Sequence, residues 1–194
     1  MKLIEAVKKK VKFLLFQFPR NIKYSFLSNA NNVKGKAKIV QPFQLNGLGK
    51  IEFGSNVTIG FESSPFLYSG YGYIEARNLN SLISIEERVF INNNVVIISE
   101  GEGITISKNT LIGINCEIYD SDFHNLAADK RLTGEPGTSK VLIENNVFIG
   151  SNVKILKGVT IGENSIIGSG SVVTKSIPKN VIAAGVPAQE IRKL

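Results

Sequence analysis

The sequence predicts an all-β fold, a coil of short strands that turns every six residues, and three observations support this. Aliphatic residues recur with a period of six along the second half of the chain. Glycine and asparagine crowd the positions between them, and these residues suit tight corners. One long interruption of the repeat carries the only histidine, His124. A chain of 194 residues with 43% hydrophobic and 20% charged residues fits one folded domain.

The repeat is most regular between residues 143 and 177. One series recurs every six residues and a second follows it by four: Ile143, Ile149, Ile155, Ile161, Ile167 and Val173, with Val147, Val153, Val159, Ser165, Ser171 and Ile177. Shorter runs precede them at Ile85, Ile91 and Ile97 and at Ile106, Ile112 and Ile118. An α-helix would scatter these residues, because six residues advance it by about 240°. Stacked coils with the aliphatic residues pointing inward fit the spacing.

The charge is concentrated at the N-terminus. Residues 1–38 hold ten basic residues and one acid, whereas residues 39–194 hold thirteen basic residues and fifteen acids. We therefore divide the chain into a basic arm, 1–38, and a repeat domain, 39–194, with a loop inserted at 119–141. No zinc-finger, helix-turn-helix or aromatic RNA-binding motif accompanies the arm, so a nucleic-acid partner is not expected.

The arm predicts an amphipathic helix that ends at Pro19. Its apolar face is formed by Ile4, Val7, Val11, Leu14, Leu15 and Phe18, and the lysines off that face are Lys2, Lys8, Lys9 and Lys12. Two interpretations remain open. Residues 1–18 contact a membrane surface, or the helix covers the open end of the fold with its lysines in water. The apolar run is too short to span a bilayer.

Single copies of cysteine and histidine exclude several kinds of site. One cysteine forms no internal disulfide, and one histidine cannot supply a metal site that needs two imidazoles, so no metal is expected. Cys116 falls at an inward position of the Ile112 repeat, which favours a small core residue over a nucleophile. A reducing cytoplasm fits this cysteine content.

The loop between Ile118 and Ile143 is the candidate for chemistry. The register jumps there by 25 residues instead of six, and long loops in compact domains are often functional. A neutral imidazole can take the proton of an attacking hydroxyl and accelerate the reaction by about 10²- to 10⁴-fold. Asp122 is expected either to orient His124 or, like Asp120, to form a turn at the mouth of the loop.

Three stretches resemble the hexapeptide-repeat acyltransferases: Asn145–Ser151, Ile167–Lys175 and Ala184–Ala188. Phe18-Pro19-Arg20 and the stretch 120–124 are similar to the branch that O-acetylates sugars of surface polysaccharides (capsule, O-antigen or exopolysaccharide). The resemblance implies a left-handed parallel β-helix of triangular section, with an N-terminal amphipathic helix and a short C-terminal tail. It also implies acetyl-CoA as co-substrate, a sugar acceptor, a cytoplasmic enzyme and a homotrimer.

The resemblance assigns roles to individual residues. His124 would be the general base and Ser151 a donor to the thioester oxygen, while Asp122 is a catalytic candidate only through its place in the loop beside His124. Residues expected near coenzyme A are Phe148, Gly150, Gly168, Ser169, Thr174, Lys175 and Arg192, and those expected near the acceptor are Asn92, Glu100 and Arg131. In the implied trimer, His124 of one subunit faces Phe148 and Lys175 of the next. Phe148 replaces the tryptophan usual at its position, which leaves the size of the acyl group open.

Several alternatives stay open. An amino-sugar N-acetyltransferase on the same fold would depend less on His124, and a non-catalytic scaffold would not bind coenzyme A. The enzyme is expected in the cytoplasm, with the arm allowing a peripheral position at the inner face of the membrane. The aromatic residues between Ile59 and Ile83 would either stack on a saccharide or cover an imperfect coil or a subunit contact: Phe61, Phe66, Tyr68, Tyr71 and Tyr73.

Overall fold

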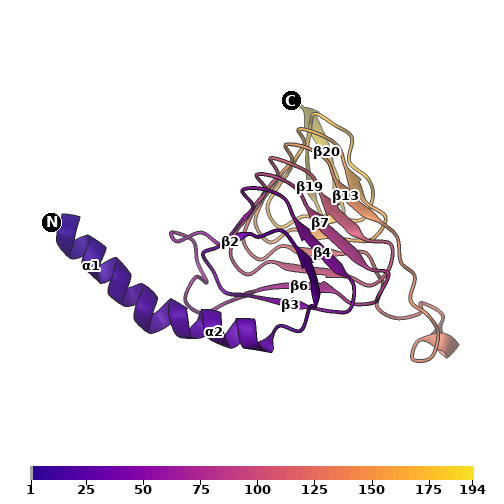
Figure 1. The fold of residues 1–194 in the computed structure, drawn as a ribbon. Coiled ribbons are helices and arrows are strands. Elements are labelled where there is room, and N and C mark those ends of the chain that lie inside the picture. Colours follow the sequence, from indigo (N-terminus) through magenta and orange to yellow (C-terminus); the bar gives the residue numbers. More distant parts are fainter. Residues whose placement is uncertain (1) are drawn as a thin grey trace.

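A computed structural model describes residues 2–194, except the side chains of Lys2, Leu3 and Lys9. Three parallel sheets form the sides of a triangular prism, and a long helix leaves the prism at its N-terminal end (Figure 1). Each turn of the chain contributes one strand to each sheet in the order A, B, C. The predicted left-handed parallel β-helix is confirmed.

The strands are short, as the six-residue period requires. Sheet A contains β1 (Asn32–Lys34), β4 (Lys50–Phe53), β7 (Leu82–Ile85), β10 (Ile104–Ile106), β13 (Val141–Ile143) and β16 (Thr160–Ile161). Sheet B contains β2 (Lys38–Ile39), β5 (Thr58–Ile59), β8 (Phe90–Ile91), β11 (Leu111–Ile112), β14 (Phe148–Ile149), β17 (Ile166–Ile167), β19 (Val181–Gly185) and β20 (Ala188–Lys193). Sheet C contains β3 (Phe43–Asn46), β6 (Gly72–Ala76), β9 (Val96–Ser99), β12 (Glu117–Tyr119), β15 (Lys154–Ile155) and β18 (Val172–Val173).

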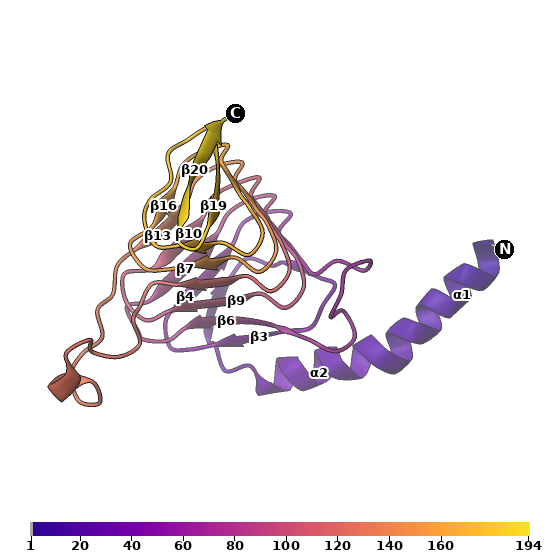
Figure 2. The ribbon, with the colours of Figure 1, turned by 180° about the vertical axis from the view of Figure 1, so that it is seen from behind.

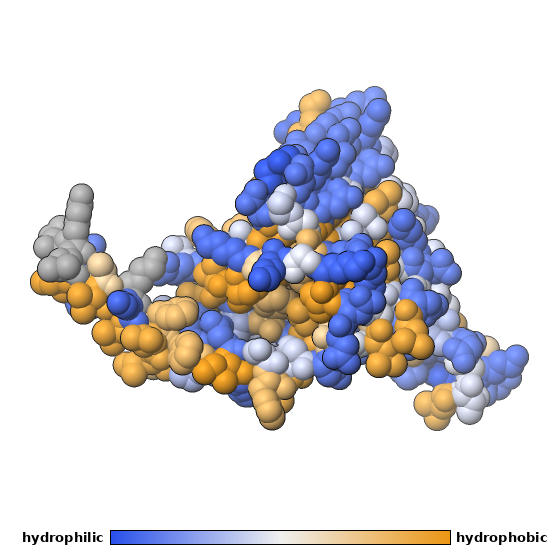
Figure 3. Space-filling model, in the orientation of Figure 1, coloured by the Kyte–Doolittle hydropathy of each residue, from blue (hydrophilic) through white to orange (hydrophobic). Residues whose placement is uncertain are grey.

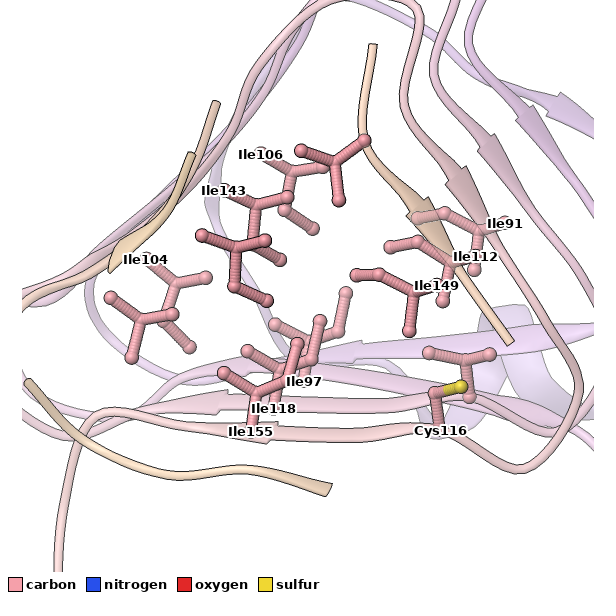
Figure 4. Close-up of a cluster of buried hydrophobic side chains, with 14 of the residues drawn as sticks. Ile91, Ile97, Ile104, Ile106, Ile112, Cys116, Ile118, Ile143, Ile149 and Ile155 are labelled. Carbon is pink, nitrogen blue, oxygen red and sulfur yellow. The ribbon is translucent and has the colours of Figure 1, made fainter. Parts of the chain in front are cut away.

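The strand register explains the repeat. Ile143 pairs with Ile161 in sheet A and Ile149 with Ile167 in sheet B. Each pair is 18 residues apart, so one coil uses three six-residue units and each unit enters a different sheet. The inward isoleucines stack into columns that fill the prism (Figure 4). Burial of such side chains is the main favourable term in folding.

Cys116 lies in this core, next to the isoleucine columns, and is fully buried. Burial raises the pKa of its thiol to about 11, because an apolar environment disfavours the thiolate. A neutral buried thiol is a poor nucleophile. The prediction of a core residue is therefore confirmed.

Asparagine forms ladders at two of the corners. The side chain of Asn94 donates to Asn115 at 2.8 Å, and Asn115 donates to Asn152 at 3.1 Å. The second ladder runs through Asn146, Asn164 and Asn180. All six residues have φ between 55° and 62°, a region that asparagine tolerates better than most residues. The corner residues are therefore fixed by both backbone conformation and side-chain hydrogen bonds.

The predicted start of the repeat domain needs correction. The coils begin at β1, before the predicted boundary at residue 38, since Asn32 to Lys34 pair with β4. The predicted short C-terminal tail contains the strand β20, which pairs antiparallel with β19 at the edge of sheet B. A strand that reverses direction there stops parallel coils from adding to that edge.

The arm helix does not end at Pro19, contrary to the prediction. It continues as α1 (Lys2–Lys12), a π-helical segment η1 (Phe13–Gln17) and α2 (Phe18–Leu27). Proline lacks the N–H that an α-helix uses. Just before Pro19, the Phe18 N–H donates to the carbonyl oxygen of Phe13, five residues earlier, as in a π-helix. Pro19 occupies the first turn of α2, where a backbone N–H has no partner within the helix, so its missing N–H breaks no helical hydrogen bond.

The arm runs away from the coils, so α1 does not cover the end of the fold (Figures 1 and 2). The part of the arm that lies beside β3 is α2, and the Gln44 side chain of β3 donates to the carbonyl oxygen of Leu27 in α2 at 2.9 Å. Across residues 2–194, no helix combines the length and apolarity needed to cross a bilayer.

The aromatic segment between β5 and β6 packs within the subunit. Tyr71 stacks on Tyr24 of α2 with ring centroids 4.3 Å apart. Phe61 meets Phe90 edge-on at 5.9 Å. These contacts favour the interpretation that the segment covers an irregular coil and holds the arm.

Candidate functional site

The inserted loop leaves the prism at the corner between sheets C and A, from β12 to β13, and projects well beyond the coils (Figures 1 and 2). Its bounds agree with the predicted 119–141 within one residue at each end. A short helical turn, η2 (Ala128–Lys130), lies in its outer part. The loop therefore carries its side chains away from the subunit to which it belongs.

Asp120 anchors the mouth of this loop. Its buried carboxylate accepts the Ser99 hydroxyl at 2.7 Å and the backbone N–H groups of Glu100 and Gly103, each at 2.7 Å. Four hydrogen bonds in all, including one from Gly101 N–H at 3.3 Å, tie β12 to the irregular turn after β9. The structural role considered for Asp120 fits this arrangement.

Asp122 does not contact the histidine. Its carboxylate lies 3.2 Å from the Lys157 ammonium on the neighbouring coil. Its backbone N–H donates to Gly137 O at 3.0 Å, which joins the two sides of the loop. Within the described residues, no hydrogen bond joins Asp122 to His124, so an orienting role for Asp122 would require the pair with Lys157 to rearrange.

His124 is exposed, and the residue before it holds an unusual conformation. Phe123 has φ of 62°, which is rare for an aromatic residue and costs about 1–3 kcal/mol. Its ring meets Tyr119 edge-on at 5.2 Å and lies 5.2 Å from the Arg77 guanidinium. Its N–H donates to the Ser121 hydroxyl at 2.9 Å. Phe123 thus fixes the direction in which the chain enters His124.

Acidic and basic side chains surround Phe123, the residue that precedes His124. Arg77 pairs with Glu75 at 3.0 Å and with Glu100 at 3.2 Å, and the Ser121 hydroxyl donates to Glu100. Hydrogen bonding to Glu75 is the largest cause of the raised pKa of Arg77, which keeps the guanidinium charged. Glu100 was predicted to contact the acceptor, whereas Arg77 and Phe123 were missed because no local pattern marks them.

The outer part of the loop is exposed. Arg131 donates to Leu126 O at 3.3 Å within the loop itself, and Asn125 donates to Glu135 O at 2.9 Å. Leu126 and Leu132 extend into solvent. The predicted acceptor residue Arg131 thus lies away from the other candidates in this subunit.

A second set of candidates lies at the corner between sheets B and C. Phe148 is half-exposed on the outer face of β14, between Leu111 and Ile166 of the adjoining coils. Ser151 follows at the corner, and its N–H donates to the Ser169 hydroxyl at 3.1 Å. An apolar strip beside small polar side chains suits an extended chain such as pantetheine.

Glycines at this corner let the coils approach closely. A Cβ on Gly150 would lie 2.7 Å from Ser169 N, and one on Gly168 would lie 2.7 Å from Ala184 Cβ. Any larger residue would push the coils apart. Close packing of the coils therefore requires glycine at these positions, independently of the predicted contact with coenzyme A. Asn92 belongs to the same corner, after β8.

The remaining candidates are elsewhere. Thr174 and Lys175 follow β18 and are exposed at the corner that carries the His124 loop. Lys175 therefore lies at the same corner as His124. The prediction had instead grouped Lys175 with Phe148, on the subunit that faces His124. Arg192 is exposed on β20, with its guanidinium 3.1 Å from Lys193 O. Two exposed cations are available for the phosphates of a nucleotide carrier.

The two corners lie at opposite ends of sheet C, because each coil passes from the B–C corner through sheet C to the C–A corner. One subunit consequently separates His124 from Phe148 and Ser151. A site that uses both sets must join the loop of one copy to the B–C corner of another.

Comparison with known proteins adds sequence relatives. The family described as bacterial transferase hexapeptide (six repeats) matches residues 140–175. Galactoside O-acetyltransferase of Escherichia coli is 42% identical over 130 residues, which cover 67% of this chain and 59% of that protein. A second Escherichia coli protein, WbbJ, is named provisionally as a lipopolysaccharide biosynthesis O-acetyl transferase. It is 32% identical over 163 residues, covering 78% of this chain and 76% of WbbJ.

A solved structure shares the fold. Galactoside acetyltransferase in complex with coenzyme A superposes with a TM-score of 0.53 at 35% identity, over 74% of this chain and 64% of that one. The chain thus spans somewhat less than two thirds of the Escherichia coli galactoside enzyme and of this solved galactoside acetyltransferase.

Proposed function

This chain belongs to the hexapeptide-repeat acyltransferase family, and we propose that it transfers an acetyl group from acetyl-CoA to a sugar hydroxyl of a surface polysaccharide or its precursor. The observation that carries this proposal is the placement of His124. It is the chain's only histidine, it is exposed, and it stands on a loop anchored by Asp120 and supported by Phe123. The relatives named above support the sugar acceptor.

The proposed chemistry is a direct transfer. Acetyl-CoA, when bound, supplies the acetyl group as a thioester. His124 removes the proton of the acceptor hydroxyl while that oxygen bonds to the acetyl carbon. The bond from the acetyl carbon to sulfur then breaks, and His124 returns the proton to the departing thiolate of coenzyme A. The buried neutral Cys116 takes no part.

The residues present fit the proposed donor. Phe148 and Leu111 offer an apolar strip to the pantetheine. The corner beside this strip carries only small side chains, those of Gly150, Ser151 and Ser169, which leave room for the donor. The N–H or hydroxyl of Ser151 is the proposed donor to the thioester oxygen. Lys175 and Arg192 are the proposed partners of the phosphates.

We further propose a homotrimer with one site at each interface, located in the cytoplasm. The loop of one subunit brings His124, with Thr174 and Lys175 on the same corner, to Phe148 and Ser151 of its neighbour. The exposed leucines Leu126 and Leu132 at the loop tip suit burial against another copy. A closed ring of this kind repeats one heterologous contact.

The test is release of free thiol from acetyl-CoA over a panel of sugars. His124→Ala is expected to lower kcat/KM for the responsive acceptor by about 10²- to 10⁴-fold while the unfolding temperature stays unchanged. Activity that remains within a few-fold of wild type would remove His124 as base and favour an amino-sugar acceptor. Absence of thiol release and of coenzyme A binding by the wild-type chain would contradict the enzyme itself.

A further inference from the structure

We propose that the arm formed by α1, η1 and α2 binds the surface of an anionic membrane. This interaction goes beyond the proposed acetyl transfer and does not depend on it. Three properties of the arm carry it: an apolar stripe along its whole length, a clamp that turns the stripe away from the coils, and lysines beside the stripe.

The apolar stripe extends further than the predicted residues 1–18. Its side chains recur at spacings of three and four and are between 46% and 89% exposed: Ile4, Val7, Val11, Leu14, Leu15, Phe18, Ile22 and Phe26. Figure 3 shows hydrophobic side chains gathered along the arm. Such a helix lies in a membrane interface with the apolar side inserted. The stripe crosses Pro19 because the helix itself continues there.

The opposite side of the arm is clamped to the coils. The buried Gln17 side chain donates to Leu67 O at 2.9 Å, and the Arg20 guanidinium donates to Leu67 O at 2.7 Å. Tyr24 stacks on Tyr71, one turn further along the helix. These contacts lie in the segment between β5 and β6, so the arm is held at a fixed angle to the prism.

The clamp determines where the stripe points. Ile22 and Phe26 each lie two positions after Arg20 and Tyr24, which places them about 200° around the helix. They therefore face away from the coils, and Phe26 is 89% exposed. The apolar stripe is therefore accessible to a bilayer.

Charge selects the bilayer over a second copy of the chain. Lys8, Lys10 and Lys12 are exposed beside the stripe, while Lys2 and Lys9 have side chains outside the described part. Residues 2–27, which form the arm, include seven basic residues and one acid, and residues 39–194 have only a small net negative charge to offer in return. Lysine is depleted in protein interfaces, whereas each lysine near an anionic leaflet strengthens partitioning by about fivefold.

The experiment is flotation of the full chain with vesicles of phosphatidylglycerol and phosphatidylcholine, compared with vesicles of phosphatidylcholine alone. The chain is expected to float with the anionic vesicles and to lose binding as salt rises. I4E/L15E is expected to weaken partitioning by about tenfold or more, since it removes two inserted side chains. K8Q/K10Q/K12Q is expected to weaken it by about a hundredfold.

The matched control is L48E/L79E, which makes the same change of charge at leucines that are 65% and 82% exposed in turns of the prism. It is expected to float like wild type. Failure of the wild-type chain to float, or equal flotation of I4E/L15E and L48E/L79E, would overturn the proposal. So would dissociation of the oligomer by I4E/L15E in sedimentation velocity, because a second copy would then cover the stripe. Thiol release measured on the same samples reports separately on the proposed activity.

Discussion

Asp120 and Asp122 are separated by one residue, yet their carboxylates lie in different surroundings. Asp120 is fully buried and accepts four hydrogen bonds, three of them from backbone N–H groups. Asp122 is partly exposed and pairs with Lys157. A buried acceptor with several donors stabilises far more than a surface ion pair, because its removal leaves those donors unsatisfied.

Asp120→Ala is expected to lower the free energy of unfolding by about 3 kcal/mol, measured by urea denaturation. Asp122→Ala, the matched variant two positions along, is expected to lower it by less than about 1 kcal/mol. Equal losses for the two variants would contradict the assignment of Asp120 as the anchor of the loop.

The sequence placed His124 on the loop that interrupts the repeat, and it placed Cys116 in the core from its register. It could not identify Arg77 or Phe123, because their contact joins β6 to a loop 46 positions later in the chain. Nor could it separate the roles of Asp120 and Asp122, since both carboxylates fit a turn locally. Residue chemistry was thus predictable where the period fixed a position, and not where the tertiary contacts of an irregular segment decide it.

At the scale of elements, the corners determine how closely the coils stack. Asn115 and Asn152 occupy the same corner with φ of 55° and 58° and share a hydrogen bond. A β-branched residue in this backbone region is strained. The excess of asparagine in the sequence therefore has a conformational cause.

Asn152→Val is expected to lower the free energy of unfolding by about 2 kcal/mol, because valine must adopt the left-handed conformation and cannot join the ladder. Asn152→Gly, which accepts this conformation freely, is expected to remain within about 1 kcal/mol of wild type. The comparison uses urea unfolding. A valine variant as stable as the glycine variant would show that the corner can relax.

Elements were predicted unevenly. The stacked coils follow from the six-residue period, whereas the triangular section was implied only by the family resemblance; in the structure each isoleucine of a series enters the next sheet. The arm was expected to stop at Pro19, because proline usually interrupts an α-helix. The π-helical turn before it offsets that effect, and no residue pattern in Phe13 to Gln17 marks such a turn.

At the scale of the molecule, the triangular section keeps the proposed base and the proposed thioester site apart. His124 projects from the C–A corner and Ser169 lies at the B–C corner, at the other end of sheet C. Periodicity alone could not reveal this separation, because it requires the assignment of each unit to a sheet. Each proposed active site therefore needs residues from a second subunit.

Subunit mixing tests this central claim most directly. His124→Ala removes the proposed base, and Ser169→Trp places bulk at an exposed position of the proposed donor groove. Each variant alone is expected to be nearly inactive in thiol release. Unfolding and refolding the two together in equal amounts should restore about one quarter of the wild-type sites, since half the subunits carry an intact base and half an intact groove. No restored activity in such mixed trimers would contradict a site shared between subunits.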